Sequence, residues 1–65
     1  MINWSMLLDS NPTAARLVEE FAKGNISRDN MLRKVPSLRE EIRSRGVNET
    51  RRLARKSLRR RGIQV

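Results

Sequence analysis

Residues 49–61 read ETRRLARKSLRRR, a stretch that combines apolar residues at helical spacing with a dense run of arginine. At about 100° per residue, the uncharged side chains gather on one side of a helix. That side consists of Thr50, Leu53, Ala54, Ser57 and Leu58. The other side carries Arg51, Arg52, Arg55, Lys56, Arg59 and Arg60, with Arg61 at the carboxyl end. The stretch therefore predicts an amphipathic helix that packs by its uncharged side.

The cationic side of this helix carries no acidic residue between its basic ones. Like charges four residues apart, such as Arg51 and Arg55, destabilise an isolated helix by a few tenths of a kcal/mol, so a side exposed only to solvent normally includes acids. Arginine offers a planar fork of donors that suits phosphate. We therefore expect this side to bind the phosphates of a nucleic acid. Neutralising about six phosphates predicts a slope of about −5 for log K against log salt.

The size and composition of the chain exclude several classes of protein. With 65 residues, a single domain over 1–65 buries only about 60% of the surface that its unfolded chain exposes. The chain has no cysteine and no histidine, which removes disulfides, zinc sites and histidine-dependent catalysis. The acidic neighbours in sequence, Glu19 with Glu20 and Glu40 with Glu41, point about 100° apart on a helix. We predict no enzyme, no metal, no cofactor and no small-molecule substrate.

Charge is distributed unevenly along the chain. Residues 1–27 contain two cations and three anions, whereas residues 28–65 contain thirteen cations and four anions. No apolar run approaches the roughly 20 residues that span a bilayer, and the amino terminus lacks the pattern of a signal peptide. The sequence predicts a soluble intracellular protein without a membrane partner, cytoplasmic in general and nucleoid-associated if it binds DNA.

The first half of the chain predicts packing helices. Residues 1–10 form either an apolar arm or a short helix, and Trp4, Leu7 and Leu8 are candidates for a protein interface, including that of a homodimer. Asn11 followed by Pro12 supplies a capping side chain and a first helical residue. A glycine in the C′ position ends the helix that begins there.

Three further helices are predicted after residue 24. Ser27 caps a helix over about 28–35, which Pro36 ends. A capping box of Ser37 with Glu40 predicts a helix over about 38–45, with Gly46 as its C′ residue and Val47 covering Ile42. Asn48 caps the basic helix of 49–61, and Gly62 with Ile63 ends it so that Ile63 covers Leu58. The fold class is all-α, with four to five short helices.

The segments LREEIRSR, GVN and ETRRLARKSLRRR, residues 38–61, resemble a helix-turn-helix in their order. The resemblance implies that the second helix enters the major groove of DNA. Arg52 stands where that motif places an apolar anchor, and Leu53 follows one residue later. The first of the two helices adds three secondary candidates for phosphate contacts, Arg39, Arg43 and Arg45.

Together these patterns predict a regulatory or architectural DNA-binding protein. Both aromatics, Trp4 and Phe21, lie outside the basic half, and single-strand binders usually stack bases on aromatics, so duplex DNA is favoured. The first alternative is an RNA-binding or ribosome-associated protein. The second is a small regulator that binds another protein through its apolar first half. A membrane-surface helix is a weaker alternative, because the apolar side of 49–61 has no aromatic residue.

Overall fold

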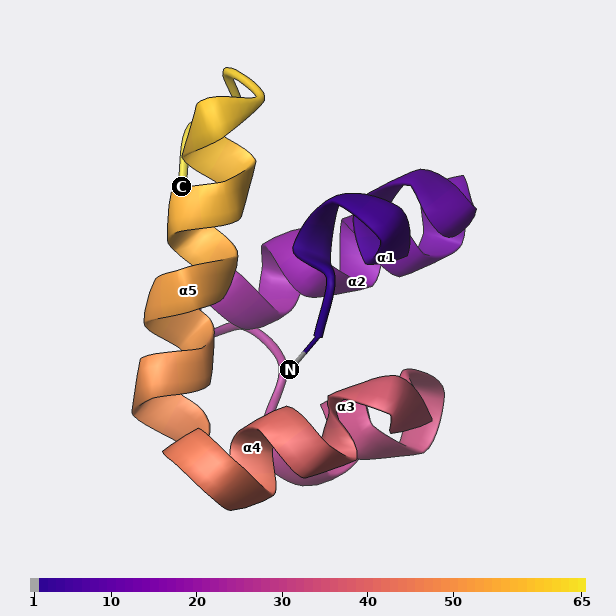
Figure 1. Cartoon of the computed structure of the whole chain (residues 1–65), viewed down its shortest axis with the longest axis vertical. Coiled ribbons are helices and arrows are strands. Elements are labelled where there is room, and N and C mark those ends of the chain that lie inside the picture. Colours follow the sequence, from indigo (N-terminus) through magenta and orange to yellow (C-terminus); the bar gives the residue numbers. More distant parts are fainter. Residues whose placement is uncertain (1) are drawn as a thin grey trace.

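The computed structural model describes residues 2–65, which form five α-helices and one 3-10 helix and contain no β-strand. The helices are α1 (Trp4–Ser10), α2 (Pro12–Ala22), α3 (Arg28–Lys34), the 3-10 helix η1 (Pro36–Leu38), α4 (Arg39–Arg45) and α5 (Val47–Arg60). The predicted all-α class is confirmed. In Figure 1, α5 stands upright, and the pair α1 and α2 and the pair α3 and α4 extend from the same side of it. The other side of α5 is left uncovered by helices in this view.

The first two helices begin with asparagine caps. The Oδ1 atom of Asn3 accepts a hydrogen bond from the amide of Met6 at 3.0 Å, and Oδ1 of Asn11 accepts one from the amide of Ala14 at 2.7 Å. The predicted start of α2 at Asn11 and Pro12 is therefore confirmed. Of the two interpretations of residues 1–10, the structure has the short helix, whereas residue 1 lies outside the described part of the chain.

The predicted end of the basic helix is also confirmed. The amide of Gly62 donates to the carbonyl of Arg59 at 3.0 Å, and the amide of Ile63 donates to the carbonyl of Leu58 at 3.1 Å. These two bonds define a Schellman ending, which satisfies carbonyls that lack partners within the helix. Ile63 is half-buried and packs against the core that contains Leu58.

The predicted capping box of Ser37 and Glu40 is wrong. Pro36 begins a tight 3-10 turn, which places Leu38 in the core with 0% exposure. The α-helix proper starts only at Arg39, and no side chain caps it. Proline fixes its own φ and favours such a first turn, and burial of Leu38 holds that turn in place.

The predicted turn between the last two helices is also wrong. A single residue, Gly46, joins α4 to α5, with φ 86° and ψ 161°. Val47 and Asn48 belong to α5, and no side chain caps its start. Instead, the amide and hydroxyl of the buried Thr50 both donate to the carbonyl of Gly46, at 3.1 and 2.8 Å. The three-residue turn of the helix-turn-helix resemblance is therefore absent.

The core lies between α2, α3, η1, α4 and α5. Its fully buried apolar residues, each with 0% exposure, are Val18, Phe21, Met31, Leu38, Ala54 and Leu58. Within α5, the buried residues Thr50, Ala54 and Leu58 all come from the predicted uncharged side, and Leu53 and Ser57 are half-buried. The amphipathic interpretation of this helix is confirmed, and its orientation fixes where its cations point.

Candidate nucleic-acid interface

The packing of α5 divides its cationic side into two groups. Arg51 and Arg55 border the buried side and are half-buried. The second group lies further round the helix, and its members line one shallow hollow of about 480 Å³. This group, called the outer cationic face below, consists of Arg52, Lys56, Arg59 and Arg60.

Arg51 and Arg55 hydrogen-bond to the end of α2 and to the loop that follows it. Arg51 Nε donates to the carbonyl of Phe21 at 3.1 Å, and its Nη2 donates to the carbonyl of Ile26 at 3.2 Å. The Arg51 guanidinium also lies 4.8 Å from the centre of the Phe21 ring. Arg55 Nη1 donates to the carbonyl of Ala22 at 3.3 Å. The last carbonyls of a helix lack intrahelical partners and carry its negative dipole end, so these two arginines stabilise the fold.

The outer cationic face has two members with partners inside the protein. Arg52 binds Glu49 through two hydrogen bonds, at 2.8 and 2.7 Å. This pairing lowers the pKa of the Glu49 carboxyl and raises that of Arg52. Arg59 donates twice to the main-chain oxygen of Val65, at 3.1 and 2.8 Å.

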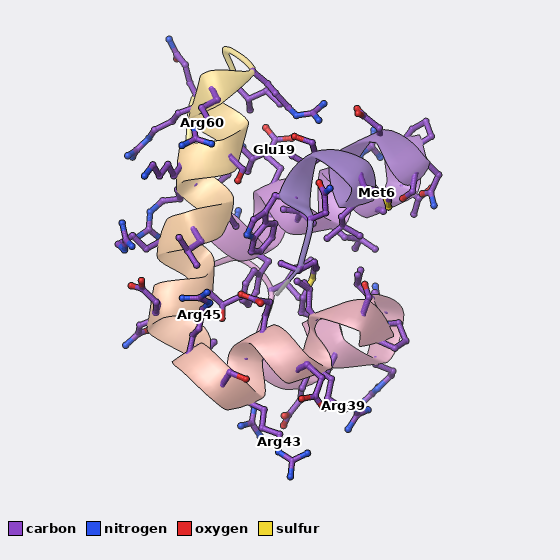
Figure 2. The ribbon with its side chains drawn as sticks, in the orientation of Figure 1. Met6, Glu19, Arg39, Arg43, Arg45 and Arg60 are labelled. Carbon is purple, nitrogen blue, oxygen red and sulfur yellow. The ribbon has the colours of Figure 1, made fainter. Side chains whose placement is uncertain are left out.

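The other two members of the outer cationic face, Lys56 and Arg60, make no side-chain hydrogen bond or ion pair with the protein among residues 2–65. Both are exposed. Arg60 projects from the end of α5 away from α4 in Figure 2. An anion that approaches these two cations displaces no protein partner, so they are the most accessible charges of the face.

Arg61, predicted to contact phosphate, instead joins α1 to the end of α5. Its Nη1 donates to Asp9 at 2.8 Å and its Nη2 to the carbonyl of Ser5 at 3.1 Å. The hydrogen bond from Arg61 lowers the pKa of the Asp9 carboxyl. Much of the charge of Arg61 is therefore neutralised within the protein.

The Asp9 contact predicts a pH-dependent stability. Because the folded pKa of Asp9 lies below its unfolded value of about 3.9, the stabilisation is complete above that pH and disappears as pH falls through the folded value. We expect Asp9→Asn to be less stable than the wild type at neutral pH, and the difference to vanish in strong acid. Urea unfolding followed by circular dichroism at several pH values measures this difference. A difference that persists unchanged at the lowest pH would contradict the assignment.

The three secondary candidates on α4 do not join the outer cationic face. Arg45 Nε donates at 2.9 Å to Glu41, which is only 5% exposed. Arg43 pairs with the exposed Glu40 at 3.7 Å. Arg39 and Arg43 lie at the end of the molecule opposite Arg60 (Figure 2).

The candidates for a protein interface lie mostly inside the chain's own core. Leu8 is 6% exposed, and Trp4 and Leu7 are half-buried against the core. The exposed apolar residue of α1 is Met6, at 69%, which sequence reasoning did not select. Met6 belongs to the same apolar run as Leu7, and this position in the sequence could have identified it as a candidate for a protein interface.

Trp4 lies beside the basic helix, which the sequence did not predict. A second hollow, of about 280 Å³, opens between α1 and the end of α5. Its lining comprises Ile2, Asn3, Trp4, Ser5, Ser57, Arg60 and Arg61. Arg60 also belongs to the outer cationic face, so the two hollows adjoin at this residue.

No group of three or more acidic, histidine or cysteine side chains in residues 2–65 could hold a metal ion. No helix in the same residues is long and apolar enough to cross a membrane. Comparison of the chain with protein-family models, curated proteins and solved structures gives no match.

Proposed function

We propose that this protein binds the phosphate backbone of duplex nucleic acid, DNA foremost, in a regulatory or architectural role. The observation that carries the proposal is the outer cationic face, four basic side chains that line one hollow on the side of α5 away from the core. In contrast to the rest of the basic residues of α5, Lys56 and Arg60 have no partner among residues 2–65. Polyanion binding is the function that such a surface serves best.

The length of the face sets the expected number of contacts. From residue 52 to residue 60 a helix rises about 12 Å. Duplex DNA carries about seven phosphates over that length, counting both strands, and about half of them can face one helix. Four cations therefore match the phosphates within reach. Because Arg52 is already paired with Glu49, about three phosphates are neutralised, and the expected slope of log K against log salt is about −2.7. This slope is smaller than the sequence suggests, because Arg51 and Arg55 bind α2 as well.

The composition of the face favours binding without base readout. Direct readout of adenine relies on bidentate contacts from asparagine or glutamine, and the outer cationic face contains neither. Its arginines can bind guanine edges as well as phosphate, but no other base-reading side chain accompanies them on the face. Contacts to phosphate position a protein but do not specify sequence. We therefore expect similar affinities for duplexes of unrelated sequence, and the discrimination between DNA and RNA duplexes to be small.

The proposal is tested by fluorescence anisotropy with labelled duplex DNA, duplex RNA and heparin at several salt concentrations. The double variant Lys56→Gln/Arg60→Gln removes two phosphate contacts. We expect it to bind DNA about 50-fold more weakly at 0.1 M salt and to lower the salt slope by about two. The wild type should bind both duplexes at low salt.

A matched control distinguishes binding by the outer cationic face from attraction of DNA by the overall positive charge of the protein. Arg39→Gln/Arg43→Gln removes the same charge from α4, at the opposite end of the molecule (Figure 2). We expect it to weaken binding by less than about 3-fold, since distant charges are largely screened beyond about 10 Å at this salt. Equal losses in the two double variants, or no binding by the wild type at low salt, would overturn the proposal.

A further inference from the structure

We propose that the hollow between α1 and α5 binds one unpaired base, stacked on Trp4, from a strand whose phosphate is held by Arg60. This inference rests on the proposed function and names the part of a nucleic acid that the second hollow takes. A duplex with an unpaired nucleotide at its end, or in a bulge, would fill both hollows at once.

The size of the hollow matches a single base. Its volume of about 280 Å³ lies just below the roughly 300–1,000 Å³ of pockets that enclose whole small-molecule ligands. A planar base can enter while its sugar and phosphate remain outside. The hollow therefore suits one group of a larger chain better than a free nucleotide cofactor.

The lining supplies the chemistry that base binding needs. The indole of Trp4 is half-buried and lines the hollow, so packing against the core fixes the ring before a base arrives. Stacking on an aromatic side chain tolerates any base. Asn3 and Ser57 add polar groups to the lining; Oδ1 of Asn3 already caps α1 by accepting from Met6, which leaves the Asn3 amino group as a donor.

The charges of the hollow favour a phosphate at Arg60. Arg61 is committed to Asp9 and to the carbonyl of Ser5, which neutralises it and holds α1 against α5. Arg60 is exposed and makes no ion pair among residues 2–65. The phosphate that joins a stacked base to the rest of its strand would therefore lie at Arg60.

The two hollows form one path for a strand, because Arg60 lines both. A strand that follows the outer cationic face toward the carboxyl end of α5 reaches Arg60 and then Trp4. Trp4 is far from the basic half in sequence, and this separation alone disfavours a role in stacking bases bound by the basic helix. In the fold, the contacts of Arg61 with α1 bring the aromatic ring to the basic helix.

Trp4 is the only tryptophan of the chain, so its intrinsic fluorescence reports directly on stacking. The probes are a short blunt DNA duplex and the same duplex with one unpaired adenosine at an end. We expect the overhang to quench the fluorescence of Trp4 and to bind about 10-fold more tightly than the blunt duplex. The blunt duplex should bind with little quenching.

Variants at residue 4 give the matched comparison. In Trp4→Leu, both duplexes should bind with the affinity that the wild type has for the blunt one, whereas Trp4→Phe should retain part of the preference. Circular dichroism checks that both variants fold, and quenching in the wild type tests the inference without any variant. Blunt-duplex binding with neither quenching nor preference for the overhang would overturn this inference alone. Failure of both duplexes to bind at low salt would overturn the proposed function as well.

Discussion

Replacing Arg51 by alanine is expected to lower the free energy of unfolding by about 3.5 kcal/mol. The variant loses two charge-assisted hydrogen bonds to main-chain carbonyls, those of Phe21 and Ile26, and such bonds contribute about 1.5–3 kcal/mol each. It also loses a cation–π contact with the Phe21 ring, worth about 0.5–1 kcal/mol where solvent reaches it. Because Arg51 is only half-buried, we expect a loss at the lower end of the sum of these contributions.

A loss of this size is large for so small a protein. At about 0.05–0.15 kcal/mol per residue, the whole chain has a free energy of unfolding of roughly 3–10 kcal/mol. Arg51→Ala should therefore unfold at a markedly lower urea concentration than the wild type, which urea titration followed by circular dichroism measures.

The neighbouring residue provides the control for Arg51. Arg52→Ala removes the same side chain one position along α5, where its partner is Glu49 on the solvent side. Exposed ion pairs contribute about 0–1 kcal/mol, so Arg52→Ala should remain nearly as stable as the wild type. Similar stability losses in the two variants would show that Arg51 has no special part in holding α2 to α5.

Replacing Gly46 by alanine is expected to cost about 2–3 kcal/mol of stability. At φ 86° and ψ 161°, Gly46 lies in a backbone region that is essentially restricted to glycine and costs other residues about 1–3 kcal/mol. A Cβ added there would meet no atom within 4 Å. The whole cost therefore comes from backbone conformation, without a steric clash, and no larger residue can avoid it.

Thermal unfolding measures this cost, with Gly24→Ala as control. Gly24 also has φ 86° and open space around a new Cβ, but it occupies the C′ position after α2, where an alanine costs about 1–2 kcal/mol. At roughly 4–8 °C per kcal/mol, we expect the melting temperature to fall by about 15 °C for Gly46→Ala and by about half as much for Gly24→Ala. A smaller fall for Gly46→Ala than for Gly24→Ala would contradict the argument.

Arg51 and Gly46 together orient the outer cationic face. Arg51 ties α5 to the end of α2, and Gly46 turns the chain directly from α4 into α5. Neither residue belongs to the face itself. Their replacement should therefore reduce nucleic-acid binding in proportion to unfolding, whereas Lys56→Gln/Arg60→Gln should reduce it in a folded protein.

The sequence predicted the local features of the fold well. Asn11 with Pro12 marked the start of α2, and Gly62 with Ile63 marked the end of α5. Each of these signals involves hydrogen bonds between residues no more than five positions apart, so the neighbouring residues alone determine them. The uncharged side of α5 was predictable for the same reason, since helical geometry fixes which residues share a side.

The wrong predictions were also local, and tertiary packing explains them. Ser37 and Glu40 carry the pattern of a capping box, but burial of Leu38 draws this segment into a 3-10 turn. Asn48 is a good capping residue in isolation, yet Gly46 lets α5 begin two residues before the predicted position. At Ser37 a capping hydrogen bond of about 1 kcal/mol is outweighed by burial of Leu38. At Asn48 the capping bond is replaced by the hydrogen bonds that Thr50 donates to the carbonyl of Gly46.

The sequence by itself determined that α5 is an amphipathic helix with an uninterrupted cationic side. Only the tertiary structure decided which of those cations are available, because the partners of Arg51 and Arg61 lie 25 to 56 residues away along the chain. The same packing places Trp4 beside Arg60. The sequence of one helix determines on which side each residue lies. Whether a charged side chain on that side is paired or free depends on tertiary contacts with the rest of the chain.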